Sequence, residues 1–478
     1  MSALVTVFFP LVFSLVLYLA TQKTQYARYI VLVIFLGLFA ESIELYTQLP
    51  KEGYLLLGSF FEVNRFDFSL VFAVDTLSVI MLLLTSILLI LVTLSSWHIP
   101  KQAAYFSLLL FFSGAIFGVF MSTNLLWFFI FWELTLIPMY FLVGIWGAEG
   151  RVYAAVKFFL YTHVASMLIL LAFFLLYKQS GTFDMTLIKE SVLVTPAFIW
   201  WLLFVGFAVK MPLFPFHTWL PDAHVQAPAP VSVLLAGVLL KMGAYAMIRM
   251  VLLMLPHQSQ KYGWVLLVLG VVSLVYAALM ALYETHLKKM VAYSSISHMG
   301  LVAIAMATLS YDGLSAALYE MIGHAFIIAP LFLIAGFFHQ KTGSWQMEDM
   351  GGIMQRAPYI STVFIIAGLG ALGFPATMGF VGEVSVLISS IESYGLWLIV
   401  VAFVSMLSAS YIIWTFRRVL YGSMSSVVRS SDFSISKMEF VALIVFSLFI
   451  IVFGIYPQVI FSLINDALSG YTFLGGRV

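Results

Sequence analysis

The sequence predicts an all-α polytopic membrane protein with about fourteen transmembrane helices. Hydrophobic residues make up 63% of its 478 residues and charged residues only 9%, whereas soluble globular chains carry about 25% charged residues. Apolar runs close to the roughly 20 residues that a helix needs to cross a bilayer recur along the chain. The segments between them are short, so we expect one membrane domain, residues 1–478, embedded in the lipid bilayer.

The apolar runs predict the spans in chain order. The first six are uninterrupted stretches rich in Leu, Ile, Val and Phe, and we expect them at 3–20, 29–47, 69–94, 104–121, 123–145 and 154–177. The seventh and the twelfth, 196–224 and 358–391, are interrupted by prolines and glycines. The remaining spans are continuous and are expected at 228–253, 263–284, 290–309, 314–339, 394–416 and 439–460.

The two interrupted spans are predicted to be broken helices. Span seven is interrupted at Pro212 and Pro215, and span twelve at Pro375 within GFPATMGFVGE. Matched interruptions in two halves of a membrane protein are typical of inverted-repeat transporters, whose ion site lies at the breaks. We therefore expect two inverted five-helix repeats, helices four to eight and nine to thirteen (104–253 and 263–416). Simple proline kinks are the alternative interpretation.

Several ionisable side chains lie inside predicted spans. A charged side chain at a helix centre costs about 2.5–3.5 kcal/mol, so these groups are expected to face one another or a hydrated interior. The acids and lysines are Asp75, Glu133, Lys157, Lys210, Lys241 and Glu383, and the histidines are His163, His217, His298 and His324. A further histidine, His224, follows the break in span seven.

An acid and a lysine on neighbouring helices can work as a proton switch, and Glu133 with Lys210 is the candidate pair. At about 4 Å and an effective dielectric near 20, such a pair attracts by roughly 4 kcal/mol, which favours the charged lysine. When the carboxylate moves away, desolvation favours the neutral lysine. Histidines titrate near neutral pH and suit the links between such sites.

Each of these residues also has a structural interpretation. Glu133 and Lys210 could form a fixed ion pair that holds helices together. Structural roles also stay open for four other residues. Lys157 and Lys241 could extend their amino groups to the membrane surface, His163 could be a packing residue, and Asp75 could cap or brace a helix.

The cysteine count and the charge distribution limit cofactors and partners. The chain has no cysteine, which excludes disulfides, thiolate-bound zinc and Cys-ligated iron–sulfur clusters. We expect no cofactor and no metal on this chain, and a net charge of +1 predicts no nucleic-acid partner. Lys and Arg are more numerous in the loops on one side, so the positive-inside rule places both termini on the outer face of a bacterial inner membrane.

Five stretches of the sequence resemble one protein family. They are FFIFWELTLIPMYFLVGIWG, KFFLYTHVAS, VKMPLFPFHTWLPDAHVQAPAPVSVLLAGVLLKMGAY, KKMVAYSSISHMG and GFPATMGFVGE. Together the chain resembles the antiporter-like membrane subunits of respiratory complex I (NADH–quinone oxidoreductase), and the M type most. The resemblance covers nearly the whole chain. The same family includes subunits of multi-subunit sodium/proton (Mrp) antiporters and of membrane-bound hydrogenases, which are the alternative parent complexes.

The resemblance implies a translocase subunit that pumps protons through two half-channels. Flavin, iron–sulfur clusters and quinone would belong to partner subunits, and the L- and N-type antiporter-like subunits would be neighbours in the membrane. Proton transfer is implied for Glu133, Lys210, Lys241 and Glu383, and proton relay for His217, His298 and His324. Further candidates for a role in the path are Asp75, Lys157 and His224.

The sequence departs from the family pattern in ETHLKKMVAYSS. Here His286 takes a position that is usually acidic in the family, and Lys289 takes that of an arginine. Glu284 is the candidate to substitute for the missing acid. The departure concerns contacts of a loop rather than the buried axis.

Overall fold

The computed structural model describes residues 3–21, 26–50, 53–60, 69–191, 196–396 and 399–469. Within these ranges the chain is predominantly helical, and eleven helices are long and apolar enough to cross a membrane. They are Ala3–Thr21, Ala27–Gln48, Thr76–Ser95, Gln102–Met121, Leu125–Trp146, Arg151–Ser180, Ala229–Leu253, Pro256–Tyr283, Leu287–Ala307, Tyr311–Thr342 and Lys437–Ile455. The prediction of a multi-pass helical membrane protein is confirmed.

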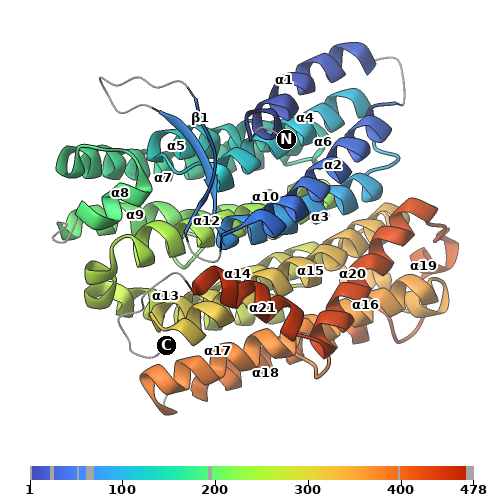
Figure 1. The fold of residues 1–478 in the computed structure, drawn as a ribbon. Helices are drawn as coiled ribbons and strands as arrows, with labels where there is room; N and C mark the ends of the chain where they lie inside the picture. The colour runs from blue at the N-terminus through green and yellow to red at the C-terminus, as the bar shows by residue number, and fades with distance from the viewer. Residues whose placement is uncertain are drawn as a thin grey trace. The chain divides into compact units, whose positions relative to one another are not determined.

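The chain divides into two compact units, and most of their helices are labelled in Figure 1. The first unit comprises the described parts of Met1–Lys210, Met242–Lys261 and Leu463–Thr472. The second comprises the described parts of Met211–Lys241 and Tyr262–Ser462. The chain leaves the first unit directly after Lys210 and returns to it directly after Lys241.

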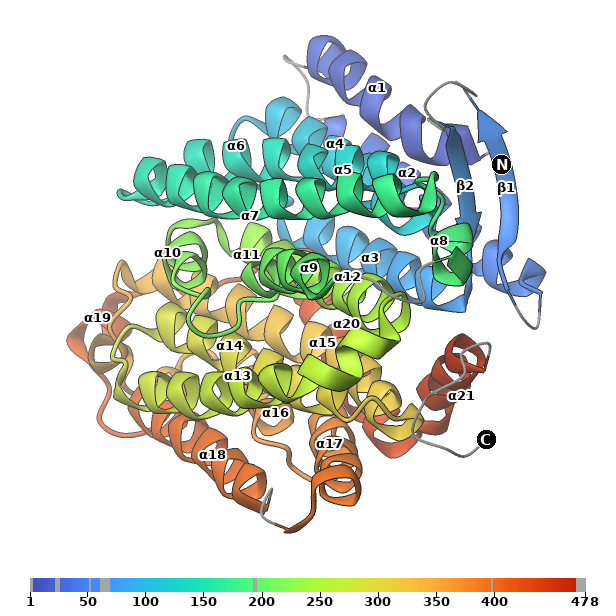
Figure 2. The ribbon, with the colours of Figure 1, turned by 90° about the vertical axis from the view of Figure 1, so that its left-hand side faces the viewer.

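The first unit is built mainly from the N-terminal helices. They are α1 (Ala3–Thr21), α2 (Ala27–Gln48), α3 (Thr76–Ser95), α4 (Gln102–Met121), α5 (Leu125–Leu134), α6 (Leu136–Trp146), α7 (Arg151–Ser180), α8 (Met185–Ser191) and α9 (Ala197–Lys210), with the π-helical segment η2 (Met247–Leu253). Helix α1 packs along α4, and α7 packs against both α6 and α9. Figure 2 shows α6 and α7 side by side.

A β-hairpin precedes α3 and corrects the all-α prediction. Strand β1 (Leu55–Phe60) pairs antiparallel with β2 (Leu70–Val74). The expected helix at 69–94 is therefore wrong over residues 69–75, about its first two turns, because α3 begins only at Thr76. A short apolar run such as LVFAV fits a strand or a helix equally well. Asp75 fixes the boundary as the N-cap of α3, where its carboxylate accepts from the Ser78 N–H at 2.9 Å.

The second unit is organised around one long helix. Its elements are α10 (Trp219–Gln226), α11 (Ala229–Leu234), the π-helical η1 (Leu235–Leu239), α14 (Leu287–Ala307), α15 (Tyr311–Thr342), the short η3 (Met347–Met350) and η4 (Ile353–Gln355), α16 (Pro358–Ala371), α17 (Met378–Tyr394), α18 (Ile399–Val419), α19 (Ser426–Ser430) and α20 (Lys437–Ile455). Helix α15 is buried along most of its length and packs against α11, α14, α16, α17 and α20. Figure 2 shows α14 and α15 side by side.

Three helices belong partly to each unit. They are α12 (Leu240–Ala246), α13 (Pro256–Tyr283) and α21 (Gln458–Leu468). Helix α12 continues the run that starts with α11 and η1, so Lys241 is the second residue after a π-helical segment.

The two interrupted spans are built from shorter helices. In 196–224, α9 ends at Lys210 and α10 begins at Trp219, with turns between them. In 358–391, α16 ends at Ala371 and α17 begins at Met378. The segment between α16 and α17 contains Gly373 at a φ of +69°, in the left-handed region that glycine adopts most readily.

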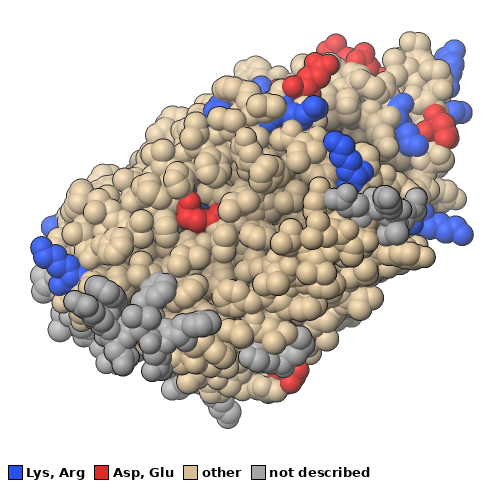
Figure 3. Space-filling view, turned by 90° about the horizontal axis from the view of Figure 1, so that it is seen from above, with Lys and Arg blue, Asp and Glu red and all other residues tan. Residues whose placement is uncertain are grey.

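The surface matches the composition. The face in Figure 3 is dominated by side chains other than Lys, Arg, Asp and Glu. Large apolar side chains are exposed along several helices, such as Val152, Leu160, Val164, Leu171 and Phe174 on α7. An exposed apolar stripe of this length is suited to contact with lipid or with another membrane subunit.

We expect Gly114→Ala to loosen the packing of α1 on α4. A Cβ at Gly114 would lie 2.6 Å from the Val7 carbonyl oxygen and 2.8 Å from Leu11 Cγ, so the helices must separate. The expected loss of stability is about 1–3 kcal/mol, measured as a lower midpoint of thermal unfolding in detergent. Gly37→Ala on α2 is the control, because nothing lies within 4 Å of its added Cβ. Equal midpoints for the two variants would contradict this packing.

Candidate functional site

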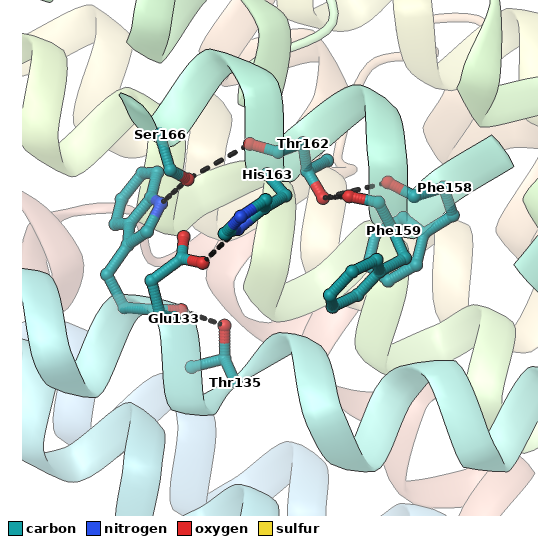
Figure 4. A network of polar contacts seen from close by, with 8 residues as sticks. Glu133, Thr135, Phe158, Phe159, Thr162, His163 and Ser166 are labelled. Carbon is teal, nitrogen blue, oxygen red and sulfur yellow. Dashed lines mark hydrogen bonds and ion pairs between the residues drawn. The ribbon is translucent and has the colours of Figure 1, made fainter. Parts of the chain in front are cut away.

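The first polar cluster lies in the first unit, between α5 and α7 (Figure 4). His163 Nδ1 donates to Glu133 Oε2 at 2.6 Å, and the His163 ring stacks on Phe159 with centroids 5.5 Å apart. The side chains of His163 and Glu133 are 40% and 20% exposed, so the pair lies at the margin of the unit. His163, for which packing was one sequence-based interpretation, is therefore the direct partner of Glu133.

Lys210 lies deeper, at the C-terminal end of α9. The residue is 1% exposed, and its Nζ is 5.5 Å from the Trp132 ring centroid and 5.6 Å from the Phe158 ring centroid. No hydrogen-bond partner of Nζ is found among the described residues, although the Glu133 carboxylate acts on it electrostatically. The Lys210 amino group thus contacts the faces of two aromatic rings. It forms no direct hydrogen bond to Glu133 in this structure.

The aromatic surface beside Lys210 is fixed to the helix that carries His163. Trp132 Nε1 donates to Ser166 Oγ at 3.1 Å, and the Ser166 hydroxyl donates to the Thr162 carbonyl at 2.9 Å. Ser166 and Thr162 lie on α7, and Trp132 lies beside Glu133 on α5. The Trp132 indole thus connects α5, which carries Glu133, with α7, which carries His163.

A second cluster in the first unit is an ion pair. Arg249, in η2, donates from Nη2 to Asp75 Oδ1 at 2.6 Å and to Ser78 Oγ at 3.2 Å, and from Nη1 to the Tyr54 hydroxyl at 2.6 Å. Arg249 and Asp75 are buried, and the guanidinium also lies over the Tyr245 ring at 4.9 Å. Asp75 thus both caps α3 and braces it against η2.

In the second unit, Lys241 is 1% exposed on α12. Its Nζ donates to the Ala236 carbonyl at 2.8 Å and contacts His324 Nδ1. Ala236 belongs to the π-helical segment η1, and π-helical turns in α-helices are frequent at functional sites. The amino group therefore points into the unit, so the alternative that it extends to the membrane surface is wrong.

His324 is next to a buried carboxylate–imidazole pair. His298 Nδ1, on α14, donates to Glu320 Oε1 on α15 at 2.9 Å, and both residues are almost fully buried. The His298 and His324 rings have centroids 5.3 Å apart. The structure thus gathers Lys241, His298 and His324, as the sequence predicted for a relay, and adds Glu320.

Two other candidate histidines lie in apolar surroundings. His217 is 3% exposed and packs on Phe214 and Tyr276, with ring centroids 5.6 and 5.1 Å away. His224 is fully buried and stacks on Phe332 at 4.6 Å. Neither ring nitrogen of His224, nor Nδ1 of His217, has a hydrogen-bond partner in the described parts of the chain. Such nitrogens remain available to water or to a migrating proton.

The remaining candidates lie apart from these pairs. Glu383 follows Gly382 on α17, and a Cβ on Gly373 would lie 2.6 Å from its Oε2. Glu383 also acts electrostatically on His298. Lys157 is half-buried near the start of α7, with its Nζ 5.7 Å from the Tyr153 ring centroid.

A lysine that the sequence reasoning did not single out closes the end of α10. Lys288 is 1% exposed, and its Nζ donates to the carbonyls of Ala227 and Val225, the latter at 3.5 Å. The amino group also lies 5.2 Å from the Trp345 ring centroid. Carbonyls at a helix end lack partners within the helix, so Lys288 is explained by this structural role.

The departure from the family pattern near His286 has a structural explanation. His286 is the N-cap of α14, where its Nδ1 accepts from the Lys289 N–H at 3.3 Å. Burial, together with the nearby Lys288 ammonium, lowers the pKa of His286 to about 4, so the ring is a neutral acceptor near pH 7. Glu284 forms an ion pair with the Lys289 side chain at 2.6 Å. His286 therefore supplies the helix cap and Glu284 the negative charge.

Three of these partners escaped the sequence reasoning, and each carried a weak signal. Glu320 lies inside predicted span 314–339, one helical turn before His324, and Arg249 lies inside span 228–253. Both are charges in apolar runs, which by itself predicts a partner. His163 was recognised as lying within a span, but nothing in the sequence indicated which residue it faces.

No metal site is found in the described ranges. They contain no group of three or more His, Asp or Glu side chains placed to hold an ion. The clusters consist instead of single carboxylates, imidazoles and amines. Imidazoles exchange protons near neutral pH, and buried carboxylates and amines do so when their surroundings shift their pKa values.

A family model and similar curated proteins point to the same protein family. Residues 122–408 match the family model described as NADH:quinone oxidoreductase/Mrp antiporter, TM. The chain is 36% identical over 429 residues to NADH-quinone oxidoreductase subunit M of Rickettsia prowazekii, which covers 88% of this chain and 84% of that protein. It is 36% identical over 469 residues to NAD(P)H-quinone oxidoreductase chain 4 1 of a Picosynechococcus species, covering 94% and 88%.

Solved structures agree with these relatives. The fold is similar to a chain of respiratory complex I from Thermus thermophilus with bound NADH, with a TM-score of 0.87 and 26% identity over 99% of this chain and 100% of that one. It is also similar to a chain of the Mrp complex from Dietzia, with a TM-score of 0.86 and 19% identity over 98% and 97%. The second likeness concerns the fold alone.

We expect Arg249→Met to destabilise the protein by about 3 kcal/mol, because it leaves the buried Asp75 carboxylate without its ion-pair partner. The double variant Asp75→Asn with Arg249→Met should recover part of this loss. Thermal unfolding in detergent measures both, and Arg417→Met, at an exposed arginine, is the control. A single variant as stable as the control would show that the pair does not brace α3.

The N-cap of α14 is expected to weaken in acid. Its folded-state pKa of about 4 lies below the ordinary 6.5, so the cap is complete above pH 6.5 and is lost as the pH falls toward 4. Protection of the amides after His286 from hydrogen exchange, corrected for intrinsic rates, should fall over this range by about 1 kcal/mol. His286→Asp should keep its protection, since a carboxylate stays ionised down to about pH 4. Identical pH profiles for both proteins would refute the role of His286.

Proposed function

Because this chain belongs to the family of NADH:quinone oxidoreductase and Mrp antiporter membrane proteins, we propose that it is a proton-translocating, antiporter-like subunit of a respiratory NADH–quinone oxidoreductase. It is a multi-pass membrane protein, and we place it in a bacterial inner membrane with both termini outside. Its neighbours would include L- and N-type antiporter-like subunits. Flavin, iron–sulfur clusters and quinone would be bound by partner subunits, whose redox chemistry supplies the free energy.

One observation carries this proposal: each unit contains a deeply buried lysine near a carboxylate–imidazole pair. Lys210 and Lys241 are each 1% exposed. Burial of an amino group strongly disfavours its charged form unless a counter-charge is near. A lysine whose counter-charge can move is therefore able to take up and release a proton, which a purely structural spacer does not require.

In the first unit, Glu133 has two alternative partners. Its Oε2 is bonded to His163, while its Oε1 and the Lys210 amino group both lack hydrogen-bond partners among the described residues. We propose that the carboxylate moves between His163 and Lys210. Near His163 it leaves Lys210 neutral, and near Lys210 it favours the ammonium. The roughly 4 kcal/mol attraction of such a pair exceeds the about 2.3 kcal/mol needed to move a proton across 100 mV.

In the second unit, Lys241 would pass the proton on through His324 and His298 toward Glu383. The contact of Lys241 with His324 and the short separation of the two rings support the first steps. We further propose that 104–253 and 263–416 are inverted repeats, with broken helices at 196–224 and 358–391. The positions of α9 with α10 and of α16 with α17 support this.

A sodium/proton antiporter subunit is the alternative function, because the family description includes Mrp antiporters. The ammonium groups of Lys210 and Lys241 cannot ligate sodium, since they offer only donors. Purification separates the two functions: co-purifying flavin and iron–sulfur subunits would mark the redox complex, and their absence from an intact complex would favour the antiporter.

The proposed function predicts that Lys210→Ala in the assembled complex slows proton transfer through this chain by about a hundredfold or more, as expected when a positioned acid or base is removed. The measurement is the number of protons moved per electron in proteoliposomes during NADH oxidation. Lys178→Ala, at an exposed lysine on α7, is the matched control. If Lys210→Ala pumped like this control, the proton-switch mechanism would be wrong.

A further inference from the structure

The buried carboxylate of Glu320 has no role in the mechanism described so far. The residue is 2% exposed and lies in the first third of α15, the helix against which most of the second unit packs. A charged group in such a position is expensive unless it is paired, and its one hydrogen bond given by the structure is the donation from His298 at 2.9 Å. An amide at this position would satisfy His298 as well, without a charge. The hydrogen bond alone therefore does not explain the acid.

Glu320 stands at the end of a chain of titratable groups. Lys241 Nζ contacts His324 Nδ1, the His324 and His298 rings are 5.3 Å apart, and His298 bonds Glu320. These groups come from three helices, α12, α14 and α15. The Nε2 atoms of both histidines have no partner among the described residues, so each ring can exchange a proton with water or with its neighbour.

The neighbouring helix leaves room for the carboxylate. Gly382 of α17 lies against Glu320, and a Cβ there would be 2.2 Å from Glu320 Oε2. A side chain at this position would therefore require the Glu320 carboxylate, whose other oxygen is bonded to His298, to shift. The next residue on α17 is Glu383, the acid at which the proposed path ends.

The first unit contains the same combination of a glutamate–histidine pair and a buried lysine, but the glutamate and the histidine lie on the opposite helices of the pair. There, Glu133 on the fifth predicted span pairs with His163 on the sixth, and the carboxylate acts electrostatically on Lys210. In the second unit, His298 on the tenth predicted span pairs with Glu320 on the eleventh, and the carboxylate acts electrostatically on Lys241. Spans five and six correspond to ten and eleven in the expected repeats.

We propose that Glu320 is a proton-transfer residue of the second unit, and that it accepts the proton that leaves Lys241. This rests on the proposed function. In the step, the Lys241 ammonium loses a proton to His324, the proton passes to His298, and the Glu320 carboxylate accepts it as a carboxylic acid before release toward Glu383. Only N–H and O–H bonds are formed and broken, so no oxidant or reductant is needed.

Three variants of the assembled complex test this proposal in proteoliposomes. Glu320→Gln keeps the size and the hydrogen-bonding capacity of the side chain but cannot ionise, so we expect pumping through this chain to slow by about a hundredfold. Glu320→Asp keeps the acid and should retain part of the pumping. Gly382→Ala keeps the Glu320 side chain but forces its carboxylate to shift away from His298. We expect this variant to pump as slowly as Glu320→Gln. Glu348→Gln, at an exposed glutamate of η3, is the control and should pump normally.

The outcomes separate this proposal from the proposed function. If Lys241→Ala stops pumping while Glu320→Gln pumps like the Glu348→Gln control, Glu320 is structural and this inference is wrong, whereas the function stands. Glu320→Asp pumping less than Glu320→Gln would also overturn it, because shape would then matter more than ionisation. If Lys210→Ala, Lys241→Ala and Glu320→Gln all pump normally, the proposed function itself fails.

Discussion

The structure depends on one constraint: an ionisable group inside an apolar helix must be compensated by the protein itself. Only 9% of the residues are charged, so each buried charge determines which residue of a neighbouring element it must meet. Arg249 on Asp75, His163 on Glu133 and His298 on Glu320 are three such contacts between different elements. In an apolar interior these few bonds fix the rotation of a helix more specifically than the surrounding leucines can, because unpaired polar groups are costly there.

The completeness of the compensation separates structural charges from those suited to chemistry. Arg249 donates to three partners, and Lys288 to two carbonyls of a helix end. Replacing either residue would leave several buried acceptors without a donor. Lys210 rests on aromatic faces, which attract an ammonium without bonding it in one direction. A lysine held in this way can lose its proton without leaving a buried acceptor unsatisfied.

The sequence predicted a multi-pass helical membrane protein and indicated that Lys210 and Lys241 lie inside it, because hydropathy and charge are properties of single segments. It did not predict β2, since LVFAV fits either secondary structure, nor the partners of the buried charges. Whether Glu133 meets Lys210 or His163 depends on how α5, α7 and α9 are rotated about their axes, and no spacing within one helix encodes that rotation. Glu320 lies one helical turn before His324 in the same predicted span, so the spacing of these two residues already indicated that they share one face of a helix.

Backbone irregularity connects these observations. Lys210 is the last residue of α9, where free carbonyls and the helix dipole favour a cation. Lys241 follows the π-helical η1, and its amino group binds the carbonyl of Ala236 within that segment. Both lysines therefore have backbone dipoles as a permanent partial counter-charge, whatever their carboxylates do. The proline-rich break that ends α9 at Lys210 thus places this amino group at a helix end, where backbone dipoles favour its charged form. Under the proposed function, a movement of Glu133 then decides between ammonium and amine.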